Sequence, residues 1–145
     1  YFGAQQIQGL CSYFFGAVHP GTAVELNRCY YNSMSDNPYG KKRGTENEMV
    51  CLDGKDSCED CRETDVKDIK SVHFTLCQKP WICPLGISRK NALCGDFHRK
   101  WFEVRQDWEK SLGMDPPKEN ANADDFSLGY CHGSGERNYQ QIIVD

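Results

Sequence analysis

The sequence predicts an α/β chain with a cysteine-rich insertion, and three observations support this fold class. Residues 91–112 place apolar side chains at helical spacing behind Asn91, a suitable N-cap. Residues 71–76 alternate between apolar and polar side chains, which is typical of a short strand with a polar face. Nine cysteines occur among 145 residues, several of them in or beside a turn-rich stretch at 33–70. We therefore expect a mixed fold braced by disulfides.

Composition and charge exclude two classes of partner. Lys and Arg number 17 against 21 Asp and Glu, so the formal charge is -4 and no broad basic surface is available for nucleic acid. The longest mainly apolar stretch, 11–18, is shorter than the roughly 20 residues that span a bilayer. We expect no membrane span in this chain. Because the sequence starts at Tyr1 without a signal segment, we expect a processed chain or a piece of a longer one.

The remaining elements are predicted from periodicity and turn residues. Residues 4–15 are predicted to form a short amphipathic helix that Gly16 ends, and 23–31 to form a strand. Residues 33–70 are interpreted as a long surface insertion stapled by disulfides. Residues 113–145 carry few large apolar side chains and are expected to form a loosely ordered polar tail or linker.

The long helix has a clear apolar face. Its members recur at three- to four-residue spacing: Leu93, Phe97, Trp101, Val104, Trp108 and Leu112. We expect this face, including both tryptophans, to pack on a core. His98, Arg99 and Arg105 are then expected on the solvent side.

The cysteine count favours an oxidising compartment, because disulfides persist in secreted and lumenal proteins. An odd count leaves at least one thiol without an intramolecular disulfide partner. Three cysteines of the insertion and Cys29 are expected to make two disulfides, and Cys83 with Cys94 can make another. A structural zinc held by two cysteine pairs is the open alternative, with ligands Cys58, Cys61, Cys77 and Cys83.

His73 and Lys79 are the candidate functional residues that the pattern itself suggests. His73 lies at the end of the strand predicted at 71–76, and Lys79 follows the next turn, before Pro80 and Trp81. An imidazole can complete a divalent-metal site, and an ammonium neutralises a diphosphate as a point charge. The open alternative is a strand histidine with one satisfied hydrogen bond beside a solvated lysine.

The segment His73-Phe74-x4-Lys79-Pro80-Trp81 resembles a motif of glycosyltransferase family 8, the glycogenin-like and galactinol-synthase-like enzymes. The resemblance implies that His73 is a ligand of Mn²⁺, or another divalent cation, that holds a UDP-sugar, and that Lys79 contacts its diphosphate. The stretch from Gln8 to Phe15 is similar to the family's Asp-Gln-Gly-Leu-Leu-Asn helix, so Gln8 is implied to reach the transferred sugar.

The resemblance implies the C-terminal part of a GT-A type nucleotide-diphospho-sugar transferase domain at residues 1–112, with 113–145 as tail. No Asp-x-Asp occurs in the chain, so the metal-binding half is expected upstream and the piece is expected to be inactive by itself. Ile7 and Leu76 stand where the family has Asp and Gly. These two departures leave a catalytically degenerate transferase open.

The function that the resemblance implies is metal-dependent transfer, with retention, of a sugar from a UDP-sugar to a carbohydrate or glycoprotein acceptor. The alternative is a secreted, disulfide-rich module that binds carbohydrate or protein through Trp81 and the Tyr30-Tyr31 pair. For either function we expect the lumen of the secretory pathway, the Golgi for the enzyme, or the extracellular space.

Overall fold

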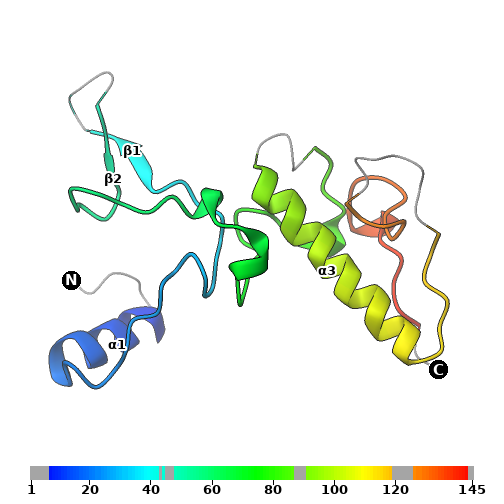
Figure 1. The fold of residues 1–145 in the computed structure, drawn as a ribbon, viewed down its shortest axis with the longest axis horizontal. Coiled ribbons are helices and arrows are strands. Elements are labelled where there is room, and N and C mark those ends of the chain that lie inside the picture. Colours follow the sequence, from blue (N-terminus) through cyan, green and yellow to red (C-terminus); the bar gives the residue numbers. More distant parts are fainter. Residues whose placement is uncertain (1–6, 43, 45–47, 87–90, 119–125, 144–145) are drawn as a thin grey trace.

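The computed structural model describes residues 7–42, 44, 48–86, 91–118 and 126–143. Its longest element is helix α3 (Ala92–Ser111), and helix α1 (Ile7–Tyr13) lies at the opposite end of the molecule (Figure 1). Short 3-10 helices lie along the chain between and after them: Cys61–Glu63, Val66–Asp68, Pro80–Ile82 and Glu136–Asn138. Among these described residues, no helix is both long and apolar enough to cross a bilayer.

One small sheet lies inside the insertion predicted at 33–70. Strands β1 (Tyr39–Lys41) and β2 (Met49–Cys51) pair antiparallel, with Gly40 opposite Val50. Within the described part of the chain this is the only sheet with named strands. The α/β transferase fold that the resemblance implies therefore stays a prediction.

The two strands predicted at 23–31 and 71–76 are wrong. In the first, the backbone N–H groups of Tyr30 and Tyr31 donate to the Asn27 carbonyl and make a turn, which brings Cys29 inward. In the second, Val72 makes a single parallel bridge with Ser33, after which the chain turns. Alternation of apolar and polar residues indicates a half-buried extended segment, but a strand also needs a neighbour along its length.

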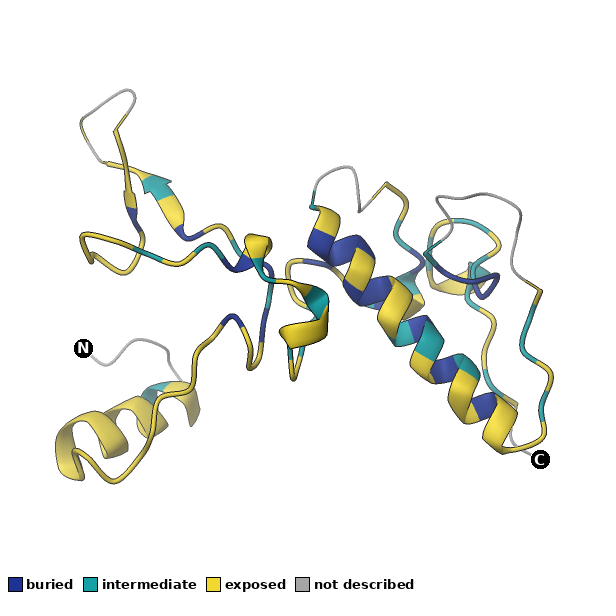
Figure 2. Ribbon diagram, viewed as in Figure 1, coloured by how far each residue is buried: buried dark blue, intermediate teal, exposed yellow. Residues whose placement is uncertain are grey.

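The N-terminal helix differs from its prediction in where it ends and in the lack of a buried face. Residues 4–6 of the predicted helix lie outside the described residues. Gly16 does not end the helix, because α1 continues as a π-helix over Phe14–Val18, closed by the His19 N–H on the Phe14 carbonyl. None of the residues in these two segments is buried (Figure 2). The amphipathic pattern thus has no core beneath it in the described structure.

Helix α3 confirms the helix predicted at 91–112 almost to the residue. The Asn91 side chain accepts a hydrogen bond from the Cys94 N–H at 3.3 Å, as an N-cap does. The same amide exchanges two hydrogen bonds of 2.9 Å with Ser35, which ties the start of the helix to the insertion. Gly113, at φ 74°, follows the last turn.

The buried face of α3 is not the predicted one beyond its first two turns. Leu93 and Phe97 are buried as expected, and Trp101 is half-buried. Three members of the expected face are exposed instead: Val104, Trp108 and Leu112. Four other residues are buried in their place: His98, Phe102, Arg105 and Glu109. Two of them, His98 and Arg105, were expected in solvent. Figure 2 shows this buried stripe along the helix.

A buried polar network explains the rotated face. Arg105 Nε donates to Glu109 Oε1 at 2.9 Å, with both side chains about 95% removed from solvent. The Tyr130 hydroxyl donates to Glu109 Oε2, and the Arg105 guanidinium lies 3.9 Å from the centre of the Tyr130 ring. Burial, and then the neighbouring Glu109, raise the pKa of Tyr130. The charges are tolerated in the interior because each has a partner.

The expectation of a loosely ordered tail is wrong for residues 126–143. Leu128 and Tyr130 are fully buried and form a small core with Phe102, on which Trp101 and Tyr139 pack. The Tyr130 ring stacks on Phe102 at 5.5 Å. This segment covers the second half of α3, which is why the helix can bury Arg105 and Glu109 there.

Eight of the nine cysteines form disulfides. Two of these confirm the bridges expected within the insertion and Cys29: Cys29–Cys61 and Cys51–Cys58. The expected pairing of Cys83 with Cys94 is wrong, since the structure has Cys77–Cys94 and Cys83–Cys131. The same assignment overturns the zinc alternative, because all four of its ligands are oxidised. Cys11 is the free thiol and is exposed.

We expect Cys77→Ala/Cys94→Ala to lower the free energy of unfolding by about 3–5 kcal/mol. The disulfide closes a chain segment of separation 17, and both residues lie in the core cluster with Leu93 and Phe97. Urea unfolding of the oxidised protein measures the loss. Cys51→Ala/Cys58→Ala, which opens a shorter and more exposed loop, should cost about 2 kcal/mol. An equal or larger loss in that control would contradict a central role for Cys77–Cys94.

Glu109→Ala is expected to lower the free energy of unfolding by about 3–5 kcal/mol, because it leaves the Arg105 guanidinium buried without a counter-charge. The matched control is Glu103→Ala, on the same helix, whose ion pairs with Arg99 and Lys100 are exposed. It should cost less than about 1 kcal/mol. Similar losses in the two variants would show that the buried network does not set the helix face.

Candidate functional site

The candidate site is the turn that carries His73 and Lys79. The His73 N–H donates to the Ser33 carbonyl at 2.9 Å, and the Thr75 N–H donates back to the His73 carbonyl at 2.8 Å. The chain then reverses over residues 75–78, where the Gln78 N–H approaches the Thr75 carbonyl. Lys79 follows as the N-cap residue of the 3-10 helix Pro80–Ile82. His73 and Lys79 therefore flank a single tight turn.

This turn is fastened to α3 rather than to a sheet. The Cys77–Cys94 disulfide joins its middle to the first turn of the helix. On one side of the disulfide the Phe74 ring meets Phe97 edge-on at 6.4 Å, and on the other the Trp81 ring lies 6.1 Å from Trp101. The segment is thus held at both ends and at its centre.

His98, which was expected in solvent, also attaches the turn to α3. Its Nε2 lies 2.9 Å from the Cys77 carbonyl oxygen, so this nitrogen carries the proton and donates. The ring also packs on Phe74 at 5.7 Å. Burial lowers the pKa of His98, against the smaller opposing effect of the hydrogen bonds to Gln78 and Cys77. The neutral imidazole is therefore the form that holds the turn.

The backbone of the turn shows how it accommodates Leu76, one of the two residues that depart from the motif of the resembled family. Leu76 stands where that family has Gly, and its backbone is not in the left-handed region. Gln78 is in that region instead, at φ 60°. The Leu76 side chain is 57% exposed. The turn accommodates a side chain at position 76 by placing its left-handed residue two positions later.

The three predicted site residues are not all brought together. The His73 side chain is exposed and that of Lys79 is half-buried, one on each side of the turn. Gln8 is exposed on α1, which among the described elements contacts only the π-helix that follows it. Figure 1 shows α1 well away from α3 and from the segment that α3 holds. The described structure places His73 and Lys79 at the two ends of one turn and leaves Gln8 apart, and the site that they are predicted to form stays a prediction.

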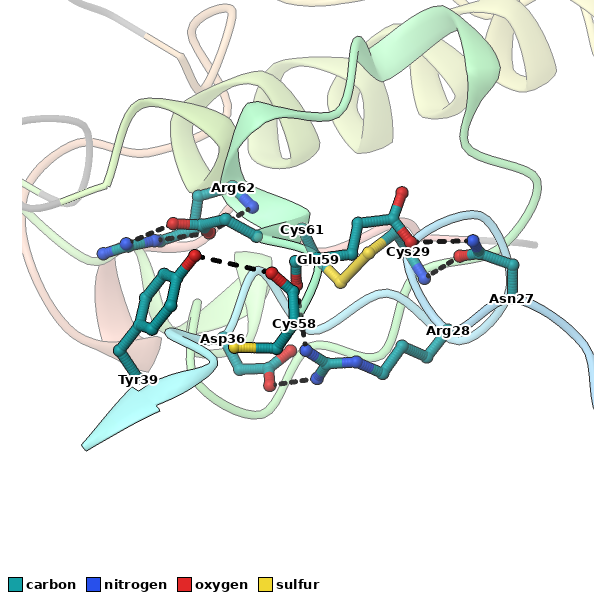
Figure 3. Close-up of a disulfide and its surroundings, with 10 residues drawn as sticks. Asn27, Arg28, Cys29, Asp36, Tyr39, Cys58, Glu59, Cys61 and Arg62 are labelled. Atoms are coloured by element: carbon teal, nitrogen blue, oxygen red, sulfur yellow. Dashed lines mark hydrogen bonds and ion pairs between the residues drawn. A yellow bond between two sulfur atoms is a disulfide. The ribbon is translucent and has the colours of Figure 1, made fainter. Parts of the chain in front are cut away.

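A polar cluster surrounds the Cys29–Cys61 disulfide (Figure 3). Arg28 pairs with Asp36 at 2.5 Å and donates to the Glu59 carbonyl at 3.2 Å. The Asn27 side chain donates to the Glu59 carboxylate at 2.9 Å. These contacts fix the segment that continues to Ser33, the residue whose carbonyl receives the His73 N–H. The backbone of His73 is thereby held on one side by the hydrogen bond to Ser33 and on the other by the turn that Cys77–Cys94 fastens to α3.

A metal at this turn would have one ligand from the described residues, the imidazole of His73. No group of three or more His, Cys, Asp or Glu side chains in the described ranges is arranged to hold a metal ion. An exposed imidazole on a fixed backbone fits the role of a single ligand. The remaining ligands would have to be carboxylates or phosphate oxygens from elsewhere.

Two hollows of the described residues have linings that include neither His73 nor Lys79. One, of about 480 Å³, lies in the insertion and is mainly acidic, with the lining Tyr30, Glu59, Asp60, Glu63, Thr64, Asp65 and Asp68. Hydrogen bonds from Arg62 lower the pKa of Asp60, and those from Lys67 lower the pKa of Asp65. The second, of about 580 Å³, lies beside Trp81 and Tyr139.

Sequence reasoning missed two residues that hold the turn, Cys77 and His98, and one that lines the second hollow, Tyr139. Cys77 lies within the motif itself, yet spacing alone does not distinguish Cys83 from Cys77 as the partner of Cys94. His98 follows the helical period of the polar face, so no local signal indicated its burial. Tyr139, in the segment interpreted as a tail, gave no signal.

Comparisons with known proteins add nothing to this site: no protein-family model, no curated protein and no solved structure matches the chain.

We expect the protein to lose stability as the pH falls through about 6.5, with His98 as one cause. Its folded-state pKa lies below the ordinary value of 6.5, so the unfolded chain binds the proton first. The contribution is therefore complete above that pH and is lost as the pH falls. In His98→Gln, whose amide can still donate to the Cys77 carbonyl, urea midpoints should fall less on acidification than in the wild type.

The control for this test is His132→Gln, at an exposed histidine in the C-terminal segment. It should retain the wild-type pH dependence of the urea midpoint. If His98→Gln also retains it, the buried imidazole is not a pH-sensitive support of the turn.

Proposed function

We propose that this chain is the C-terminal part of a metal-dependent, retaining glycosyltransferase that uses a UDP-sugar, of the glycogenin-like and galactinol-synthase-like family. The observation that carries the proposal is that the motif residues His73 and Lys79 flank one turn clamped to α3 by the Cys77–Cys94 disulfide. Transfer of a sugar from a nucleotide diphosphate needs cationic groups held rigidly where charge develops on the leaving group. A fixed turn with an imidazole and an ammonium meets that need.

Each of the two side chains has a separate task in this proposal. His73 contributes its imidazole as one ligand of a divalent cation such as Mn²⁺. Lys79 neutralises the negative charge that develops on the departing diphosphate as the glycosidic bond breaks. A divalent cation bound there supplies Lewis-acid stabilisation of the same charge. No general base is required for the leaving group to depart.

Lys79 is well placed for this task by its backbone position. It is the N-cap residue of the 3-10 helix Pro80–Ile82, so its backbone is fixed by the hydrogen bond that its carbonyl accepts from the Ile82 N–H at 3.0 Å. Its side chain is half-buried, and it makes no ion pair among the described residues. The ammonium is therefore available to an anionic ligand and is partly shielded from water, which strengthens its attraction to phosphate.

Gln8 is proposed to contact the transferred sugar, as the resemblance implies. In the described structure α1 meets only its own continuation, and its apolar side chains Ile7 and Leu10 are about 60% exposed. The proposal requires α1 to pack on another part of the complete domain, which would bring Gln8 to the donor. Four disulfides are compatible with the lumen of the secretory pathway or the cell exterior, where we propose that the enzyme acts.

The test is UDP-sugar turnover by the full-length protein with His73→Ala. Loss of one ligand should lower kcat by about 10²–10³-fold and raise the Mn²⁺ concentration needed for half-maximal rate. Lys79→Ala should lower kcat without changing the Mn²⁺ requirement as strongly. His132→Ala, at an exposed histidine away from the turn, should be unchanged.

An unchanged rate and unchanged Mn²⁺ dependence in His73→Ala would remove the metal role and with it the transferase proposal. A wild type that binds UDP without turnover would instead identify a catalytically degenerate transferase. A protein that binds neither UDP nor Mn²⁺ but still binds glycans would be the disulfide-braced binding module.

A further inference from the structure

The hollow beside Trp81 lies between the 3-10 helix Pro80–Ile82 and the C-terminal segment, which a disulfide holds beside it. The 3-10 helix Pro80–Ile82 ends at Cys83, whose disulfide to Cys131 brings in the segment that leads to the 3-10 helix Glu136–Asn138, and the Gly135 N–H donates to the Ile82 carbonyl at 2.9 Å. The lining consists of Trp81, Glu136, Tyr139, Gln141 and Ile142. A hollow of about 580 Å³ is within the usual range of small-ligand sites.

The aromatic walls of the hollow are held in place by a third ring. Trp101 of α3 lies 6.1 Å from Trp81 and 6.2 Å from Tyr139. Trp81 nevertheless keeps 40% of its surface exposed. Tyr139 is fixed through its backbone as well, since it pairs with Cys131 and its N–H donates to the Glu136 carbonyl. Both rings are therefore oriented before any ligand binds, which lowers the entropic cost of binding.

The polar side chains of the hollow are available to a ligand. The carboxylate of Glu136 and the amide of Gln141 are exposed, and neither makes a side-chain hydrogen bond or an ion pair with another described residue. Together they offer hydrogen-bond acceptors and one amide donor. An open aromatic surface beside planar polar side chains suits a ligand with one apolar face and hydroxyls at its edge.

A pyranose ring has this combination of surfaces. The axial C–H groups of a sugar make an electropositive face that packs on the negative face of an aromatic ring, and its equatorial hydroxyls point sideways. An organic cation is the competing ligand for a Trp–Tyr–Glu hollow. The Arg105 guanidinium already lies 4.8 Å from the centre of the Tyr139 ring, and this neighbouring positive charge disfavours a second cation.

We infer that this hollow is a sugar-binding subsite, with Trp81 as the stacking platform and Glu136 and Gln141 as hydrogen-bonding partners of the hydroxyls. Lys79 and Trp81 lie two residues apart, so the subsite adjoins the turn assigned to the donor diphosphate. Its identification as the acceptor subsite rests on the proposed function. Sugar binding itself does not.

The experiment titrates the oxidised 145-residue chain with lactose, cellobiose and α-mannobiose, without nucleotide or metal, and records tryptophan fluorescence and saturation-transfer NMR. At least one disaccharide should bind with a dissociation constant in the millimolar range. Trp81→Ala should weaken that binding at least about tenfold, and Trp81→Phe should restore part of it. Gln141→Ala, at an exposed side chain, should weaken it without affecting the fold.

The matched control is Trp108→Ala, at an exposed tryptophan of α3 outside the hollow, which should bind as the wild type does. Binding that is unchanged in Trp81→Ala, or equally reduced in Trp108→Ala, would overturn the subsite. Failure of all three sugars would do the same, as would tighter binding of tetramethylammonium than of any sugar.

A failure of the transferase proposal gives a different result. His73→Ala leaves the titration unchanged in either case, because the assay contains neither donor nor metal. In the full-length enzyme, an acceptor subsite predicts that Trp81→Ala raises the KM for the acceptor and leaves hydrolysis of the UDP-sugar in the absence of acceptor unaltered. If sugar binds but the wild type does not hydrolyse the UDP-sugar, the sugar-binding subsite is supported and the transferase proposal is contradicted.

Discussion

The Cys77–Cys94 disulfide is the constraint on which the rest of the structure depends. The turn of His73 and Lys79 has no extended sheet behind it in the described residues, so its position is set by covalent attachment to α3 and by the rings around that bond. The core is correspondingly divided. One small cluster surrounds Cys77 and Phe97, and another surrounds Phe102 and Tyr130. Helix α3 joins the two, and disulfides provide the restraint that neither cluster alone would supply.

The sequence was informative wherever the determining interaction is local. The cap at Asn91 and the helical period predicted α3, and the turn-rich composition of 33–70 predicted a disulfide-stapled insertion. The face of α3 was mispredicted because Arg105 and Glu109 enter the interior only in company with Tyr130, a residue distant in sequence. Burying an ion pair depends on a partner that local periodicity does not reveal. The predicted strands failed for the same reason, since alternation at 71–76 carries no information about neighbouring strands.

The candidate site was foreseen in part. His73 and Lys79 were identified from residue type and order, and the structure places them at the two ends of one tight turn. The attachment of that turn through Cys77 and His98 was not foreseen, because connectivity among nine cysteines and the burial of a helix histidine are tertiary properties. The hollow next to the turn was also unforeseen, although Trp81 had been considered as a sugar contact. It requires the C-terminal segment to return beside residues 80–82, which Cys83–Cys131 enforces. Because Lys79 and Trp81 lie two residues apart, the charged turn and the aromatic hollow adjoin each other.

Paramagnetic broadening of backbone amide signals by Mn²⁺ in the presence of UDP tests the central claim most directly, because it reports which residues lie near the cation. In the full-length protein the transferase proposal predicts that the amides of His73, Thr75 and Lys79 broaden first, and that His73→Ala abolishes the effect there. The acidic hollow of Glu59, Asp60 and Asp65 is the natural competitor for a divalent cation. Broadening confined to that hollow, or unchanged at the turn in His73→Ala, would contradict a donor site between His73 and Lys79.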